Sequence, residues 1–138
     1  CMRALITGGA GYKGVKLAEA LLDAGHQVSI LDNFMYGFDS VFDLSRRPHL
    51  DIIQKDVRAL EKGDVAAFDM VFHLAAISGY LGCEANPKSA REINQTASEQ
   101  LAGLLAKDQY LVYASTTSIY GKSDTMLDED SPVEAVSL

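Results

Sequence analysis

The fold of this chain follows from one stretch, Thr7-Gly8-Gly9-Ala10-Gly11-Tyr12-Lys13-Gly14. It comes directly after the apolar run Ala4-Leu5-Ile6 and opens a segment with helical periodicity. A strand, a glycine turn and a helix in this order are typical of a phosphate-binding turn. We expect Gly8 to let the chain leave the strand, Gly11 to leave room for a diphosphate, and Gly14 to let the helix pack closely. A tight turn without a ligand is the alternative.

The second predicted strand ends in a carboxylate. Gln27-Val28-Ser29-Ile30-Leu31 is followed by Asp32, eighteen residues after Gly14. A carboxylate at that position can accept both hydroxyls of an adenosine ribose, and it repels a 2′-phosphate. The spacing therefore favours NAD over NADP as the cofactor. A solvated carboxylate at a strand end is the alternative.

The composition is that of an ordinary globular chain. Its 138 residues are 48% hydrophobic, enough for one domain with a proper core. The net charge of −7 and the lack of a basic patch argue against a nucleic-acid partner. No apolar run is long enough for a membrane span, and Cys1-Met2-Arg3 leads into a strand rather than a signal peptide. We expect a cytoplasmic protein without membrane association.

The two cysteines predict no special chemistry. Cys1 and Cys83 have no metal-ligand spacing and provide no disulfide framework, so no metal site is expected. Reduced thiols are the ordinary state in a cytosolic protein. A nucleophilic Cys83 is the alternative, but the sequence marks no base beside it.

Strands and helical segments alternate along the chain. Strands are predicted at 3–7, 27–31, 50–54, 69–74 and 110–114, and helices at 12–24, 57–67 and 87–107, with a short amphipathic helix before Pro48 and a loop at 75–86. This order implies parallel β-α-β units with right-handed crossovers. In a doubly wound sheet of order 3-2-1-4-5, the first and fourth strands meet where the winding reverses. A ligand should bind in the crevice there.

Further motifs complete a family pattern. After the glycine stretch come Leu31-Asp32-Asn33, Asp56-Val57, His73-Leu74-Ala75-Ala76, Asn94 and Ser115-Thr116-Thr117-Ser118-Ile119-Tyr120-Gly121. Together they resemble the extended short-chain dehydrogenase/reductases, and most of all the NAD-dependent nucleotide-sugar epimerases and dehydratases. The resemblance covers residues 2–121. It implies an α/β fold, a doubly wound (Rossmann) domain over 1–121, followed by an acidic segment over 122–138.

The resemblance implies a role for each matched residue. Contacts with the cofactor NAD are expected from Gly8, Gly11, Tyr12, Lys13 and Gly14 at the pyrophosphate, Asp32 and Asn33 at the ribose, Asp56 and Val57 at the adenine, and Leu74, Ala75 and Ala76 across the fourth strand. Thr116 matches the catalytic Ser/Thr, which hydrogen-bonds a substrate hydroxyl or keto oxygen. Asn94 should tie its helix to neighbouring backbone, and His73 is expected to be a structural histidine. Asp56 as a helix N-cap only is the alternative at that position.

The chain departs from the family at two places. Lys13 stands where the family usually has an apolar residue, which leaves the preference for NAD somewhat weaker. The family's catalytic Tyr, followed four residues later by Lys, would fall just beyond Leu138. The chain is therefore expected to be the N-terminal portion of a longer enzyme, truncated before the substrate lobe and inactive alone.

The resemblance implies an enzyme that transfers a hydride from a nucleotide-sugar to NAD. It also implies a homodimer formed through the long helix at 87–107. The alternative is a dinucleotide-binding module without catalysis, such as a sensor or scaffold. A methyltransferase on a similar sheet fits less well, because Thr7-Gly8-Gly9 lacks the acidic residue of a methyl-donor loop.

Overall fold

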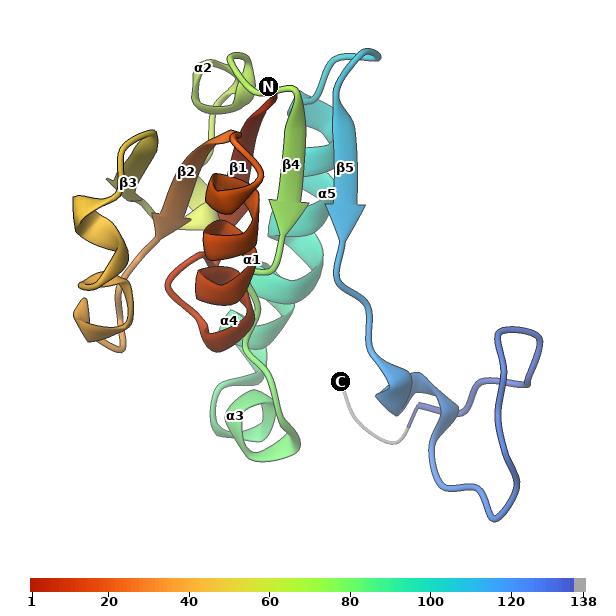
Figure 1. Cartoon of the computed structure of the whole chain (residues 1–138). Helices are drawn as coiled ribbons and strands as arrows, with labels where there is room; N and C mark the ends of the chain where they lie inside the picture. Colours follow the sequence, from red (N-terminus) through yellow and green to blue (C-terminus); the bar gives the residue numbers. More distant parts are fainter. Residues whose placement is uncertain (136–138) are drawn as a thin grey trace.

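The first apolar run becomes the middle of a parallel sheet, in the computed structural model that describes residues 1–135. Strand β1 (Arg3–Thr7) pairs with β2 (Gln27–Asp32) on one side and with β4 (Met70–His73) on the other. The edge strands are β3 (Leu50–Gln54) and β5 (Tyr110–Tyr113). The predicted order 3-2-1-4-5 is confirmed (Figure 1).

The register aligns the carboxyl ends of the three middle strands. Thr7 lies opposite Leu31 of β2 and opposite His73 of β4. The residues that follow each strand therefore leave the sheet at the same edge, since parallel strands point the same way. This edge gathers the glycine turn, Asp32 and the Leu74–Ala76 segment, which are far apart in the sequence.

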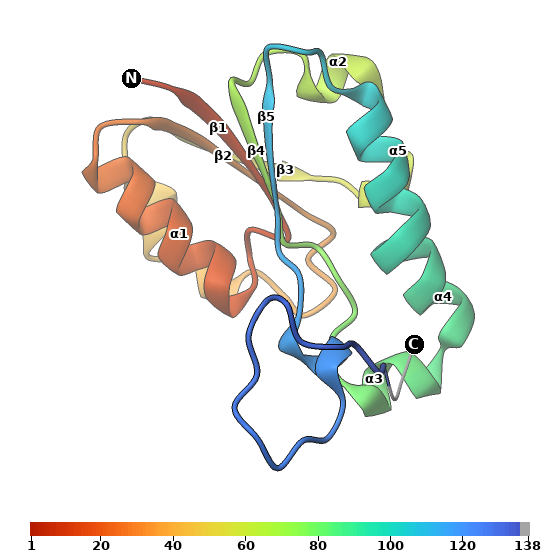
Figure 2. The ribbon, with the colours of Figure 1, turned by 90° about the vertical axis from the view of Figure 1, so that its right-hand side faces the viewer.

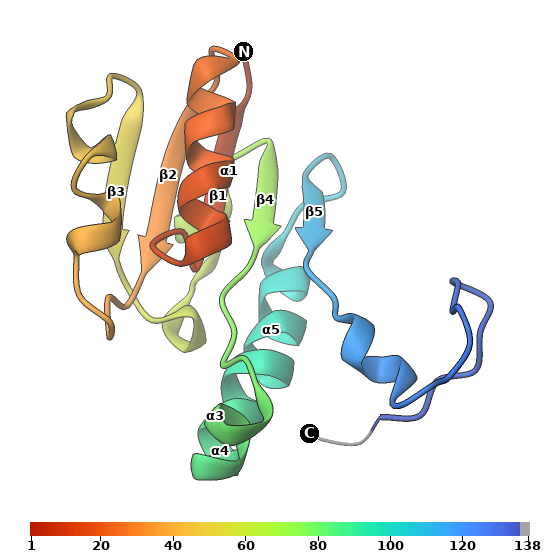
Figure 3. The same cartoon turned by 60° about the horizontal axis from the view of Figure 1, so that its bottom comes forward.

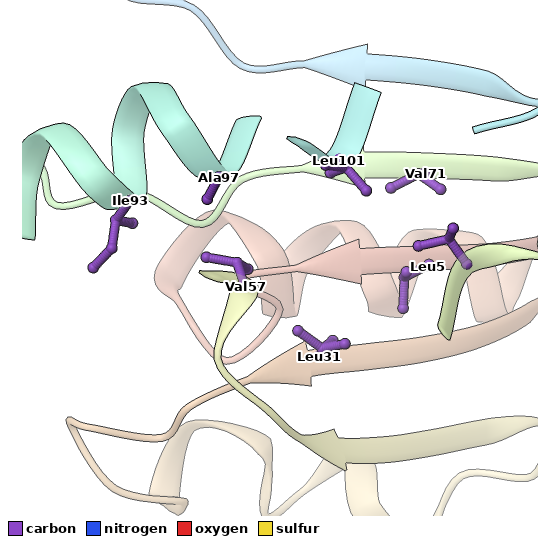
Figure 4. Packing of buried hydrophobic residues seen from close by; sticks show 8 residues of the cluster. Leu5, Leu31, Val57, Val71, Ile93, Ala97 and Leu101 are labelled. Carbon is purple, nitrogen blue, oxygen red and sulfur yellow. The ribbon is translucent and has the colours of Figure 1, made fainter. Parts of the chain in front are cut away.

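Helices cover both faces of the sheet (Figure 2). Helix α1 (Tyr12–Asp23) packs on one face, and the long helix of α4 (Pro87–Arg91), a π-helical segment (Glu92–Thr96) and α5 (Ala97–Leu104) packs on the other. Successive side chains of a strand point to opposite faces. Ile6 therefore packs in the cluster under α1, and Leu5 packs in the cluster under α5 (Figure 4).

The long helix is confirmed, although it ends at Leu104 rather than near Lys107 because Leu105 has extended backbone. Its apolar side covers the sheet: Ile93, Ala97 and Leu101 are buried in the same cluster as Leu5 of β1. The π-helical segment was not predicted. Within residues 1–135, no helix has the length and apolar character needed to cross a membrane.

Three segments differ from their predictions. The short helix expected before Pro48 consists of two 3-10 turns, Asp39–Val41 and Leu44–Arg46. The helix expected at 57–67 is a 3-10 turn followed by α2 (Lys62–Val65), because Leu60 adopts extended backbone between them. The loop expected at 75–86 contains α3 (Tyr80–Ala85), whose Cys83 is buried against the preceding segment.

The chain after β5 extends beyond the sheet (Figure 3). Thr117–Tyr120 forms a 3-10 turn, and Glu134 donates its backbone N–H to Ile119 O, which folds the acidic segment back on this turn. The side chains of β5 are exposed on this edge of the sheet. The last residues of the predicted acidic segment, 136–138, lie outside the described residues.

Candidate functional site

The turn after β1 needs glycine at two of the predicted positions. Gly8 has φ of +69°, and a Cβ there would lie 2.6 Å from the backbone N of Ala75. A Cβ at Gly14 would lie 2.6 Å from Gly8 O, so only glycine lets α1 pack this closely on the turn. A Cβ at Gly11 would instead meet only Gly8 O at 3.2 Å. One carbonyl oxygen would therefore crowd a side chain at Gly11, which is a milder restriction than the backbone contacts at Gly8 and Gly14.

Helix α1 begins with unsatisfied donors. Gly11 is its N-cap without a side-chain acceptor, and Val15 N is the first to donate within the helix, to Gly11 O at 3.0 Å. The preceding N–H groups belong to Tyr12, Lys13 and Gly14 and carry the positive end of the helix dipole. The first turn contains no acidic residue, and both Tyr12 and Lys13 are exposed. This helix end is suited to an anion.

Asp32 joins the end of β2 to the glycine turn. Its Oδ2 accepts the N–H of Ala10 at 3.1 Å, and its Oδ1 accepts the N–H of Phe34 at 2.9 Å. Each oxygen keeps a further lone pair, because a carboxylate offers about four acceptor sites. Ser40 Oγ donates to Ala10 O at 2.6 Å. The turn is thus held at Ala10 by both its N–H and its carbonyl.

The predicted adenine side lies at the end of β3. Asp56 Oδ1 accepts the N–H of Arg58 at 2.9 Å, so it caps the 3-10 turn. Hydrogen bonds from the Arg58 guanidinium hold the pKa of Asp56 below its ordinary value against the opposing effect of burial, with a smaller contribution from the Asn33 amide. The Val57 side chain is buried in the core, which leaves its backbone for a ligand.

The segment after β4 lies against the glycine turn. Leu74 N donates to Thr7 O at 3.0 Å, and Ala75 N donates to Thr7 Oγ1 at 3.4 Å. Asn94 then fixes the next residues: its Oδ1 accepts Ile77 N at 2.8 Å and its Nδ2 donates to Ile77 O at 2.9 Å. The predicted tie between Asn94 and neighbouring backbone is confirmed. Ala76 is exposed between these two anchors.

His73 is a buried structural histidine, as predicted. Its Nδ1 lies 2.6 Å from Thr7 Oγ1 and its Nε2 lies 2.8 Å from Ser98 Oγ. Ser98 donates its hydroxyl to Asn94 O at 2.9 Å, so it accepts from Nε2–H, and Thr7 donates to Nδ1. Burial lowers the pKa of His73. A neutral imidazole therefore links β1 and β4 to the long helix.

Thr116 lies at the same edge of the sheet, two strands from the glycine turn. Ala114 N donates to His73 O at 3.3 Å, which keeps the end of β5 beside the end of β4. Thr116 is exposed, and its Oγ1 accepts Ser118 N at 3.1 Å.

Tyr12 and Lys16 in α1 have the Tyr/Lys spacing of the family's catalytic pair. Lys16, however, forms an ion pair with Glu19 at 3.2 Å. This pair lies in the first turns of α1.

Sequence reasoning missed three residues that support the site. Ser40 anchors the glycine turn, Arg58 binds Asp56, and Ser98 binds His73. Two of these had a local signal: Arg58 follows Asp56-Val57 directly, and Ser98 lies one helical turn after Asn94. Ser40 had none, because its contact with Ala10 joins distant segments.

Comparisons with known proteins agree with this geometry. A family model described as the NAD dependent epimerase/dehydratase family matches residues 4–137. A UDP-N-acetyl-alpha-D-glucosaminuronate decarboxylase from Bacillus cytotoxicus is 36% identical over 136 residues, which cover 93% of this chain and 40% of that protein. A UDP-glucose 4-epimerase from Corynebacterium glutamicum is 34% identical over 138 residues, covering 96% and 41%.

A solved structure is similar to this chain over nearly its whole length. The UDP-glucuronic acid 4-epimerase from Bacillus cereus in complex with NAD superposes with a TM-score of 0.87 at 27% identity, covering 99% of this chain and 47% of that chain. The chain spans less than half the length of these relatives. Because the family model matches almost every residue, the chain belongs to the NAD-dependent epimerase/dehydratase family, within the extended short-chain dehydrogenase/reductases.

Proposed function

We propose that this chain forms the NAD-binding part of an enzyme that epimerises or dehydrates a nucleotide-activated sugar. The observation that carries the proposal is the Asp32 carboxylate, which two backbone N–H groups aim at the glycine turn. Such a carboxylate at the end of the second strand is the usual acceptor for adenosine ribose hydroxyls. The proposal also rests on the names of the relatives, which act on UDP-sugars.

The residues at this edge fit the parts of NAD. The pyrophosphate would lie at the start of α1, where the first N–H groups have no acceptor within the helix and Gly11 carries no side chain. The ribose would bind Asp32 and Asn33, and the adenine would lie beside Asp56 and the backbone of Val57. The nicotinamide half would cross β4 beside Leu74, Ala75 and Ala76. Bound NAD would supply the hydride acceptor for oxidation of a sugar carbon.

The environment of Asp32 favours NAD over NADP. Its hydrogen-bond partners are backbone N–H groups of Ala10 and Phe34, not a guanidinium or an ammonium. Among the described residues, no cationic side chain forms an ion pair with this carboxylate. A ribose 2′-phosphate placed against it would be repelled.

We place Thr116 at the sugar. Its Oγ1 accepts Ser118 N, which leaves its hydroxyl proton to be donated to a sugar hydroxyl or keto oxygen. The chain contains no other Tyr/Lys pair with four-residue spacing than Tyr12 and Lys16 in the cofactor helix. We therefore expect the 138-residue chain mixed with NAD and UDP-glucose to convert none of the UDP-glucose to product.

Titration calorimetry of the 138-residue chain with NAD and NADP tests the proposal. NAD should bind, and NADP should bind at least about tenfold more weakly, the effect of roughly 1.4 kcal/mol of charge repulsion. Asp32→Asn keeps the shape, removes the charge and should reduce this preference. Asp51→Asn removes an exposed carboxylate from the same sheet and is the matched control.

Two outcomes would contradict the proposal. Failure of the wild-type chain to bind either dinucleotide would remove the assigned cofactor site. Equal affinities for NAD and NADP would remove the role assigned to Asp32.

A further inference from the structure

The Arg58 guanidinium binds the Asp56 carboxylate through a bidentate pair of hydrogen bonds, called the fork below. Arg58 Nε lies 2.9 Å from Asp56 Oδ1, and Arg58 Nη2 lies 2.7 Å from Oδ2. Two parallel N–H···O bonds of this kind fix the orientation of both planar groups. The backbone N–H of Arg58 adds a third bond, to Oδ1 at 2.9 Å. The orientation of the Asp56 carboxylate is thus set almost entirely by one residue.

The other side of the guanidinium is held by the long helix. Arg58 Nη1 lies 3.3 Å from Glu92 Oε2 in the π-helical segment, and Lys88 Nζ lies 3.9 Å from Glu92 Oε1. Arg58 therefore bridges the segment after β3 and the long helix. Asp56 and Glu92 raise the pKa of Arg58, so the guanidinium stays charged at every pH at which the protein is folded.

The fork leaves one lone pair, on Asp56 Oδ2, for a ligand. Asp56 Oδ1 already accepts two N–H groups from Arg58, whereas Oδ2 accepts one. The Asn33 amide makes a smaller contribution to the lowered pKa of Asp56. An ionised carboxylate with a remaining lone pair accepts hydrogen bonds and cannot donate one.

We infer that Arg58 is a positioning residue that aims the Asp56 carboxylate at the amino group of the cofactor's base, and so makes the site select adenine. This inference rests on the proposed NAD site. An amino group donates to the aimed carboxylate, whereas the carbonyl oxygen of hypoxanthine at the same ring position offers only an acceptor. Two facing acceptors repel each other and leave the remaining lone pair of the carboxylate without a donor.

A purely structural role for Arg58 predicts something different. Exposed ion pairs contribute little to stability, and loss of one would change the binding of both bases equally. The positioning role instead changes the ratio of the two affinities. The ratio therefore separates the two roles without any measurement of catalysis.

The test is titration calorimetry of the 138-residue chain with NAD and with nicotinamide hypoxanthine dinucleotide. The wild-type chain should prefer NAD by about tenfold or more, the worth of one hydrogen bond to a charged group. In Arg58→Met this preference should fall to about threefold or less, with hypoxanthine dinucleotide affinity changed less than about twofold. Arg47→Met, which breaks the 2.7 Å pair with Asp23 elsewhere, should leave the ratio unchanged.

A second variant protects the test against misfolding. Arg58→Lys keeps the positive charge but loses the planar fork, and it should give a preference between those of the wild-type chain and Arg58→Met. If the wild-type chain prefers NAD and both variants keep its ratio, the inference is overturned and the proposed NAD site stands. If the wild-type chain binds neither dinucleotide, the proposed function fails and the inference fails with it.

Discussion

Replacement of Thr7 by valine tests the hydrogen-bonded link between β1, β4 and the long helix. Valine keeps the branched shape of threonine but removes the hydroxyl that donates to His73 Nδ1 at 2.6 Å. The same hydroxyl oxygen accepts Ala75 N at 3.4 Å. Thr7 and His73 are 0% and 2% exposed, so water cannot replace the lost partner without rearrangement. The substitution leaves a buried acceptor unsatisfied.

The size of the effect follows from that buried acceptor. An unsatisfied buried group costs about 1–3 kcal/mol of unfolding free energy. For a chain of this length, that loss corresponds to a fall in melting temperature of roughly 3–12 °C. Thermal unfolding at neutral pH measures it directly. Thr96→Val, at an exposed position of the long helix, is the control and should change stability by less than about 0.5 kcal/mol.

The pH dependence of stability gives a second readout of the same link. Burial lowers the pKa of His73 from its ordinary value of 6.5 in the folded state. The unfolded chain therefore binds a proton more readily than the folded chain. The stability due to neutral His73 is fully present above pH 6.5 and is lost as the pH falls below 6.5 toward the lowered pKa. In His73→Leu this part of the loss should disappear.

Two results would refute this reasoning. A Thr7→Val chain as stable as the Thr96→Val control would show that the hydroxyl carries no net stabilisation. A decrease in stability below pH 6.5 that is equally steep in His73→Leu would show that another group causes it.

Two further predictions concern the glycine turn and the start of α1. Gly14→Ala places a Cβ 2.6 Å from Gly8 O, and overpacking against backbone should cost about 1–3 kcal/mol and weaken NAD binding in calorimetry. Gly63→Ala, where a Cβ meets nothing within 4 Å, is the control, and equal effects would contradict the packing argument. Lys13→Met should weaken NAD binding about two- to fivefold at low salt, with a smaller difference at high salt. An effect independent of salt would exclude a role for the Lys13 charge at the pyrophosphate.

The sequence alone predicted the sheet and its order. The apolar run before Gly8 and the alternation of strands and helices are local patterns, and parallel β-α-β units leave few topologies to choose from. The glycine spacing and Asp32 also predicted at which edge of the sheet the candidate site residues gather. The predicted tie of Asn94 to neighbouring backbone followed from the family resemblance, and the structure confirms it.

Some elements could not be predicted, because their local patterns are weak. The segment at 57–67 was expected to form one helix, yet it breaks at Leu60, where the first turn ends before α2 starts with a capping box. Helix α3 was expected to be a loop, because its small residues carry no clear periodicity. Its position depends on Cys83, which packs against Ile77 from the preceding segment.

The contacts that support the site were decided only by the tertiary structure. Ser40 reaches Ala10 across 30 residues, and His73 joins Thr7 and Ser98 across 66 and 25 residues. The contact between the Arg58 guanidinium and Glu92 could not be predicted either, because 34 residues separate them in the sequence. Periodicity and motif spacing describe neighbours along the chain, whereas these hydrogen bonds form between side chains that only the packing of helices on the sheet brings together.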